Sequence, residues 1–164
     1  MLFRSPYLQL IASPLMELID RGIIRFVAVG ASNNVLLLPV TRIPWSAQDE
    51  VAQLNQFDIG IMPLPDSPFE RGKCGYKLIQ YMACSKPVVA SPVGVNTQIV
   101  EPGIIGLLAS TPDEWREAIL TLSKDASLRR RMGEAGRQKV ARNYSLANSA
   151  SRLIELLRSA AASR

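Results

Sequence analysis

The stretch that decides the fold is residues 57–91, FDIGIMPLPDSPFERGKCGYKLIQYMACSKPVVAS. It begins with a short apolar run, Asp58–Met62, and continues through a loop that contains three prolines. A glycine-rich turn follows, and the apolar side chains of Tyr76–Cys84 then have helical spacing. A second apolar run, Pro87–Ala90, closes the stretch. Strand, loop, helix and strand in this order form the unit from which parallel sheets are built. Such sheets bind ligands beyond the carboxyl ends of their strands.

The same alternation extends along the rest of the chain. The pattern predicts a helix over Tyr7–Asp20, which Pro14 should kink or divide after Ser13, because proline disrupts a helix interior. Thr111, with Glu114 three residues later, predicts a capped helix start. The other expected elements are strands over 23–29, 35–40 and 105–109 and helices over 47–55, 97–101, 113–123, 127–142 and 145–161. We expect the helix over 127–142 to be broken or weakened by Gly133 and Gly136.

This order predicts an α/β fold with a doubly wound, Rossmann-like parallel sheet and a helical C-terminal appendix. One feature departs from that pattern, because the chain begins on a helix. A doubly wound half starts on a strand, and that strand lies at the centre of the sheet. We therefore expect that the first strand is missing, or that the sheet has another order.

Composition excludes several classes of protein. The chain has 164 residues, of which 48% are hydrophobic and only 6% aromatic, so an aliphatic core is expected. It contains no histidine, which excludes imidazole acid–base catalysis and histidine metal ligands within these residues. No apolar run approaches the roughly 18–20 residues that span a bilayer. Two cysteines are too few for a disulfide scaffold, so a reducing, cytoplasmic location is expected.

The turn before the central helix has the chemistry of an anion site. Glycines let the backbone approach a ligand, and the N–H groups of a helix start attract anions. Lys73, Lys77 and Gln80 have the spacing of one helix face, which suits a diphosphate. The simpler interpretation is that the glycines only start a helix and the lysines are solvated surface. The turn is neither a Walker loop nor a dinucleotide fingerprint.

The stretch resembles the C-terminal, donor-binding half of group 1 glycosyltransferases of the GT-B architecture. Residues 57–64 carry the resemblance, followed by Tyr81–Cys84, Pro87–Ser91 and Gly94. It continues more weakly through 103–108, 125–137 and 144–145, and so covers nearly the whole chain. The resemblance implies a retaining, metal-independent glycosyltransferase without a cofactor. Its donor substrate would be a nucleoside-diphosphate sugar.

The resemblance also assigns candidate residues. In the family, two glutamates separated by seven residues contact the donor sugar and the ribose. Here Gln80 stands at the second position and Gly72 at the first, while Glu70 lies two residues from that first position. We expect Lys73, together with Lys77, to supply positive charge for the phosphates. The candidate substrate-binding residues are Gly30, Glu70, Gly72, Lys73, Cys74, Gly75, Lys77 and Gln80.

The resemblance makes residues 1–164 one nucleotide-sugar-binding domain, with 57–91 as its donor-binding core. The N-terminal acceptor domain of the family is absent from this sequence, so we expect the chain alone to be inactive. The gap left by the first strand would be filled by a second copy, as a homodimer, or by a rearranged N-terminus. The alternative is a non-catalytic nucleotide-binding or regulatory module.

Positive charge is concentrated near the C-terminus. The formal net charge is +5, and from Lys124 onward there are ten Lys and Arg against three Asp and Glu. A solvated helix surface is the simplest interpretation. The other candidates are an anionic membrane surface and nucleic acid. No aromatic residues interleave the basic ones, so we expect no nucleic-acid partner, and peripheral contact with the inner face of a membrane is favoured over it.

Overall fold

A computed structural model describes residues 5–31 and 38–162. Within these residues the strands are parallel and three residues long, and they form two separate sheets. The first sheet pairs β1 with β2, and the second has the order β3-β4-β5. The strands are β1 (Val27–Val29), β2 (Thr41–Ile43), β3 (Gly60–Met62), β4 (Val88–Ala90) and β5 (Gly106–Leu108).

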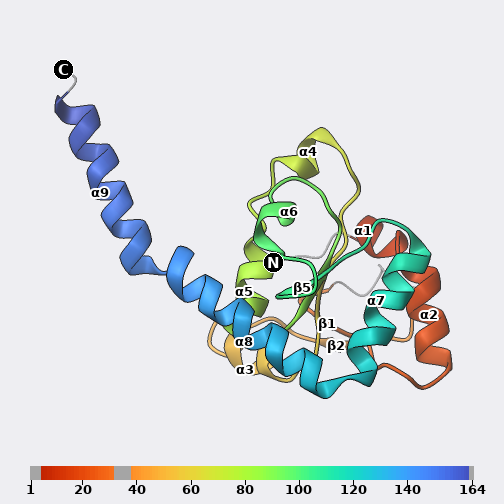
Figure 1. Cartoon of the computed structure of the whole chain (residues 1–164). Helices are drawn as coiled ribbons and strands as arrows, with labels where there is room; N and C mark the ends of the chain where they lie inside the picture. The colour runs from red at the N-terminus through yellow and green to blue at the C-terminus, as the bar shows by residue number, and fades with distance from the viewer. Residues whose placement is uncertain (1–4, 32–37, 163–164) are drawn as a thin grey trace.

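Helices cover both faces of the three-stranded sheet (Figure 1). The central strand β4 shows the two faces directly. Val88 and Ala90 pack with α5, whereas Val89 packs with α2 and α7. The helices are α1 (Ser5–Gln9), α2 (Ala12–Asp20), α3 (Glu50–Asn55), α4 (Pro68–Arg71), α5 (Tyr76–Ala83), α6 (Asn96–Ile99), α7 (Pro112–Lys124), α8 (Ala126–Asn143) and α9 (Leu146–Ala162).

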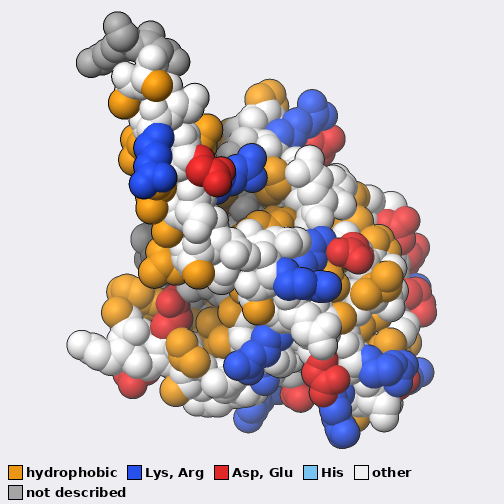
Figure 2. All heavy atoms as spheres, turned by 60° about the vertical axis from the view of Figure 1, so that its left-hand side comes forward, with side chains coloured by type: hydrophobic (Ala, Val, Ile, Leu, Met, Phe, Trp, Pro, Cys, Tyr) orange, Lys and Arg blue, Asp and Glu red, His pale blue; other side chains and the backbone are white. Residues whose placement is uncertain are grey.

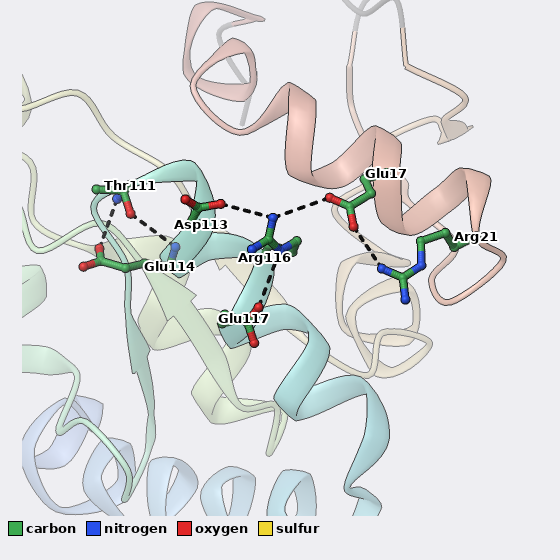
Figure 3. A network of polar contacts seen from close by, with 7 residues as sticks. All are labelled: Glu17, Arg21, Thr111, Asp113, Glu114, Arg116 and Glu117. Carbon is green, nitrogen blue, oxygen red and sulfur yellow. Dashed lines mark hydrogen bonds and ion pairs between the residues drawn. The ribbon is translucent and has the colours of Figure 1, made fainter.

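Helix α7 begins where the sequence predicted. The Thr111 hydroxyl accepts from the Glu114 N–H at 3.2 Å, and the Glu114 carboxylate accepts from the Thr111 N–H at 3.0 Å. One turn later, the guanidinium of Arg116 lies 3.1 Å from Asp113 and 3.7 Å from Glu17 of α2 (Figure 3). This charged contact lies on the surface above the buried apolar packing of α2 against α7.

The expected break in helix 127–142 is wrong, because α8 runs without interruption from Ala126 to Asn143. The two glycines serve close packing instead. A Cβ on Gly133 would lie 2.0 Å from the carbonyl oxygen of Ser85, and one on Gly136 would lie 3.1 Å from Met82. The glycines therefore let α8 lie against α5 and the turn that follows it.

The N-terminal prediction is partly confirmed. The helix expected over Tyr7–Asp20 is divided into α1 and α2, and Pro14 lies in the first turn of α2. A proline is tolerated there, because the first N–H groups of a helix have no partner within the helix. The strand expected over Ile23–Val29 is confined to its last three residues.

The strand expected over 35–40 is wrong where it can be compared. Residues 35–37 lie outside the described residues, and residues 38–40 are not in a strand. The pairing partner of β1 is Thr41–Ile43 instead. Pro39 gives the physical reason, since proline has no N–H to donate to a strand ladder. The helices expected over 47–55 and 97–101 are also shorter, and α4 was not expected.

Helix α9 extends away from the rest of the chain, from the end of α8 (Figure 1). None of its residues is buried. Hydrophobic side chains nevertheless gather along this projecting helix (Figure 2), among them Leu146, Leu153 and Leu157. Across the described ranges, we find no helix with both the length and the apolar character needed to cross a membrane.

Candidate functional site

The candidate site lies where the loops after β3 and β4 meet. Two contacts hold these loops together. The N–H of Leu64 donates to the Ser91 hydroxyl at 3.0 Å. Gly94 comes so close to α4 that a Cβ there would lie 2.5 Å from the carbonyl oxygen of Arg71. The loop that carries the candidate residues is therefore fixed to the sheet edge at two points.

Glu70 is buried inside this loop rather than exposed at its surface, with 7% of the residue accessible. Its carboxylate accepts hydrogen bonds from the Tyr7 hydroxyl, at 2.5 Å, and from the Ser67 hydroxyl. These bonds, with Ser67 contributing most and Tyr7 next, hold the pKa of the Glu70 carboxyl below its ordinary value. Glu70 is thus an ionised anchor that joins α1 to the loop.

Lys73 lies beside this anchor, in the turn before α5. Its ammonium donates to the Tyr7 hydroxyl at 2.9 Å and lies 4.3 Å from the centre of the Tyr7 ring. It is also 5.5 Å from the ring of Phe69. The prediction that Lys73 shares a helix face with Lys77 is wrong, because α5 begins only at Tyr76. The turn directs Lys73 toward α1 instead.

The start of α5 is built around Gly75, whose φ of 67° lies in the left-handed region. A Cβ there would lie 2.3 Å from Ile99, so the position admits only glycine. No side chain caps the first turn of α5. No side chain therefore competes with an anion for the N–H groups at this helix start, although the N–H of Leu78 already donates to the carbonyl oxygen of Gly75 at 2.9 Å.

A buried amide oxygen lies close to the same helix start. Asn96 is 1% exposed, and its Nδ2 donates to the carbonyl oxygen of Ser91 at 3.0 Å. Its Oδ1 has no hydrogen-bond partner among the described residues. That oxygen lies 3.5 Å from the point that a Cβ on Gly75 would occupy. The start of α5 thus combines N–H groups with the buried oxygen of Asn96, which lacks a hydrogen-bond donor among the described residues.

Lys77 follows on the first turn of α5 and is half-buried. Burial lowers the pKa of Lys77 to about 8, with Lys73 adding to the decrease and Glu50 opposing it. Gln80, one turn further along, is also half-buried. The helix start therefore has a second cation whose charge changes near neutral pH.

The other candidate residues are more scattered. Gly72 and Cys74 lie exposed in the turn beside Lys73. Gly30 follows β1 in the other sheet, where its N–H donates to Ile43 at 2.9 Å. The structure brings Glu70, Lys73, Gly75 and Lys77 into one loop and helix start, whereas Gly30 belongs to a different strand end.

Two residues of this region were not predicted from the sequence. Tyr7 was an unremarkable aromatic residue of the first helix, and nothing in a single sequence connects it with Glu70, which is 63 residues away. Asn96 lies just before the helix expected over 97–101 and was not singled out as a candidate residue. A serine followed three residues later by a glutamate, Ser67 and Glu70, was the available signal for α4.

The fold is a parallel α/β domain, and its candidate residues, apart from Gly30, lie in the loop after β3 and at the start of α5. A family model for group 1 glycosyl transferases matches residues 9–125, most of the chain. The chain therefore belongs to the group 1 glycosyltransferase family.

Curated relatives agree with this assignment. The chain is 32% identical, over 118 residues, to the D-inositol 3-phosphate glycosyltransferase of Corynebacterium urealyticum, covering 71% of this chain and 26% of that protein. It is 42% identical over 66 residues to an uncharacterized glycosyltransferase of Methanocaldococcus jannaschii, covering 39% and 19%. The chain thus spans about a quarter or less of the length of these curated relatives.

The solved structures show the same fold at low identity. HepE of Anabaena, in complex with UDP and glucose, superimposes with a TM-score of 0.76 at 18% identity, covering 94% of this chain and 46% of that one. TarM of S. aureus, in a complex that includes UDP, gives a TM-score of 0.75 at 17% identity, covering 94% and 34%. The Rossmann-like fold predicted from the sequence is confirmed.

Proposed function

We propose that this chain is the donor-binding part of a group 1 glycosyltransferase and that it binds the diphosphate of a nucleoside-diphosphate sugar at the start of α5. The observation that carries the proposal is the uncapped first turn of α5, opened by Gly75 and accompanied by Lys73 and Lys77. Helix N–H groups and nearby ammonium groups together suit phosphate oxygens. The UDP complexes of HepE and TarM support the nucleotide class.

The site residues then have distinct roles. The backbone of Gly72, Cys74 and Gly75 approaches the phosphates, and the two lysines neutralise their charge. Gln80 has both a donor and an acceptor for ribose hydroxyls. Glu70 supports the loop, because its carboxylate already accepts from Tyr7 and Ser67. Gly30, at the end of β1, remains a candidate for the nucleotide side of the site.

Titration calorimetry with UDP and with uridine tests this proposal. Binding of UDP but not of uridine is expected, because the proposed site recognises the diphosphate. GDP and ADP in the same titration identify the preferred base. A folded chain that binds no nucleoside diphosphate at millimolar concentration, or that binds uridine as well as UDP, would overturn the proposal.

The finer features of the family proposal stay predictions. We expect no sugar transfer by this chain alone, because the acceptor domain of the family is not among these residues. A donor-hydrolysis and transfer assay with the isolated chain checks this, and turnover by it would contradict the expectation. A chain that binds UDP without turnover fits the regulatory alternative equally, and adding an acceptor-binding domain of a relative distinguishes the two.

The proposed contact with the inner face of a membrane also stays a prediction. Helix α9 supports it, since Leu153 and Leu157 are exposed on a helix that also carries Arg152 and Arg158. Part of the basic charge of α8 is already engaged, because Lys139 lies 2.7 Å from Glu101. Sedimentation with anionic vesicles, compared with DNA binding across a salt series, measures the preference.

A further inference from the structure

Glu50 is a half-buried acid in the first turn of α3 and was not among the predicted site residues. Its carboxylate accepts a hydrogen bond from the indole Nε1–H of Trp45 at 3.1 Å. Trp45 follows β2 directly after Pro44 and is 49% exposed. This hydrogen bond holds one oxygen of the carboxylate in place. A carboxylate has about four acceptor sites, so Glu50 can accept further donors.

Helix α3 lies alongside α5, the helix of the proposed donor site. Leu54 of α3 packs against the apolar cluster that contains Leu78 of α5. The carbonyl oxygen of Asn55, at the end of α3, accepts from the ammonium of Lys86 at 2.9 Å, just beyond the end of α5. The carboxyl ends of the two helices are thus held together, and Glu50 lies at the opposite end of α3.

Electrostatic contacts agree with this placement. Burial lowers the pKa of Lys77 to about 8, and the negative charge of Glu50 opposes that decrease. Burial also raises the pKa of the Cys84 thiol, and Glu50 adds to the increase. Lys77, Gln80 and Cys84 are spaced at i, i+3 and i+7, so they share one face of α5. Glu50 therefore lies on the side of α5 that carries Gln80.

The end of β1 borders the same place. A Cβ on Gly30 would lie 3.1 Å from the Cβ of Trp45, so Trp45 stands directly against this strand end. Parallel sheets bind ligands at the carboxyl ends of their strands, and Gly30 and Trp45 follow two such ends. We call the five residues Gly30, Trp45, Glu50, Lys77 and Gln80 the polar corner.

We propose that Glu50 accepts hydrogen bonds from the 2′- and 3′-hydroxyls of the donor's ribose and thereby selects nucleotides with an intact ribose. The inference rests on the diphosphate site proposed above at the start of α5. Ribose hydroxyls are hydrogen-bond donors, and an ionised carboxylate is a stronger acceptor for them than the neutral amide of Gln80. Glu50 would thus contact the donor directly, and Trp45 would act as a positioning residue.

The charges of the polar corner favour a neutral, hydroxylated group beside Glu50. A phosphate at this carboxylate would be repelled, because both groups are negative. At the start of α5 the ammonium groups of Lys73 and Lys77 attract the phosphates instead. The diphosphate therefore fits the helix start, and the adjoining ribose fits the position between Glu50 and Gln80, one turn further along α5.

The test compares UDP with 2′,3′-dideoxy-UDP by titration calorimetry at pH 6.5, where Lys77 is charged. We expect the parent chain to bind UDP about thirtyfold more tightly than the dideoxy compound, and Glu50→Ala about threefold or less. Asp49→Ala is the matched control. It removes the same charge from an exposed neighbour whose side chain makes no cap hydrogen bond, and should keep the discrimination of the parent chain.

The ratio of the two affinities separates this inference from the proposed function. Equal binding of both compounds by the parent chain would overturn the role of Glu50 and leave the diphosphate site intact. Binding of neither compound would overturn the diphosphate site and this inference with it. A folded Glu50→Ala that discriminates like the parent chain would assign the ribose to other residues.

A second variant examines the hydrogen bond that holds Glu50. Trp45→Phe keeps an aromatic ring and removes the indole N–H that donates to Glu50. We expect its preference for UDP over the dideoxy compound to fall about threefold, because Glu50 keeps its charge but loses its orientation. Unchanged discrimination in the folded variant would exclude Trp45 as a positioning residue. The comparison of the two ligands on the parent chain stands even if a variant does not fold.

Discussion

The ammonium of Lys73 lies 2.9 Å from the hydroxyl of Tyr7, a residue 66 positions away in the sequence. The same hydroxyl donates to the buried carboxylate of Glu70 at 2.5 Å. An ammonium, a hydroxyl and a carboxylate are therefore arranged in series across α1 and the loop after β3. If the start of α5 binds a diphosphate as we propose, the phosphate would compete with the Tyr7 hydroxyl for Lys73.

Replacing Lys73 by alanine should weaken UDP binding. A charge-assisted hydrogen bond contributes roughly 1.5–3 kcal/mol, which corresponds to a loss of about ten- to a hundredfold in affinity. Titration calorimetry measures the change. Lys86→Ala is the matched control, because Lys86 donates to Asn55 beyond the other end of α5. Unchanged UDP affinity in Lys73→Ala would exclude Lys73 from the donor site.

Tyr7→Phe should act on the same site indirectly. It keeps the ring and removes the hydroxyl that holds Lys73, so Lys73 loses its orientation but not its charge. We expect UDP affinity to fall about two- to tenfold, the effect of one hydrogen bond of about 0.5–1.5 kcal/mol. Tyr144→Phe, at an exposed tyrosine, is the control. If Tyr7→Phe binds UDP like the parent chain, the Tyr7 hydroxyl has no positioning role.

UDP binding should weaken as the pH rises from 7 to 9. The pKa of Lys77 is lowered to about 8, chiefly by burial, so this lysine loses its positive charge across that interval. Lys77→Arg should keep its charge and remove most of the pH dependence. Titrations with UDP at pH 7, 8 and 9 give the comparison. Identical pH profiles for the two proteins would show that Lys77 does not contact the phosphates.

The same pKa shift predicts the pH dependence of stability. Because the folded pKa of about 8 is below the ordinary value of 10.5, the unfolded chain binds more protons between these values. The contribution of Lys77 to the free energy of unfolding should therefore rise between pH 8 and 10.5. Urea unfolding of the parent chain and of Lys77→Met across this range isolates the contribution. If the free energy of unfolding changes with pH in the same way in the parent chain and in Lys77→Met, Lys77 does not make this contribution.

Gly133→Ala should destabilise the fold. A Cβ there would lie 2.0 Å from the Ser85 carbonyl oxygen, so α8 would have to move away from α5. Overpacking of this kind costs about 1–3 kcal/mol, even though alanine is the better helix former. Urea unfolding measures the loss, with Glu134→Ala at the adjacent exposed position as the control. A midpoint equal to that of the control would show that α8 tolerates the methyl group.

Removing residues 146–164 should leave stability nearly unchanged. No residue of α9 is buried, so its loss removes no described core contact. Surface changes of this kind usually alter the free energy of unfolding by less than about 0.5 kcal/mol. Thermal unfolding of the shortened chain measures its stability, and titration with UDP shows whether its affinity for UDP is unchanged. A large decrease in the midpoint of unfolding would show that α9 packs on the core in solution.

The parts of the fold that were predicted from the sequence depend on local signals. Helix α7 is an example, because its capping box lies within four consecutive residues, Thr111–Glu114. Helix α5 likewise follows from its own apolar spacing. Strand β2 could not be placed in this way. Thr41 and Arg42 are exposed, and only their pairing with β1 makes them a strand.

The site shows the same division between local and distant information. Gly75 was predicted as part of a helix start, and α5 begins directly after it. The partners of Glu70 and Lys73 were not predictable, because Tyr7 reaches them from α1 through the tertiary fold. The glycines of α8 were misread for a related reason. A glycine lowers local helix propensity, but Gly133 is required by a contact with Ser85, which lies in another segment.

The separation of the two sheets has a consequence for how the chain unfolds. Among the described residues no strand ladder joins β1 to β3, and the segments around β1 and β2 contact the remaining structure through packed side chains such as Ile23, Phe26 and Leu38. Breaking that packing releases the pair without breaking a strand hydrogen bond. Regions attached in this way open at a lower free energy than the global transition. We therefore expect residues 23–31 and 38–43 to form a separate cooperative unit that opens before the rest of the described chain.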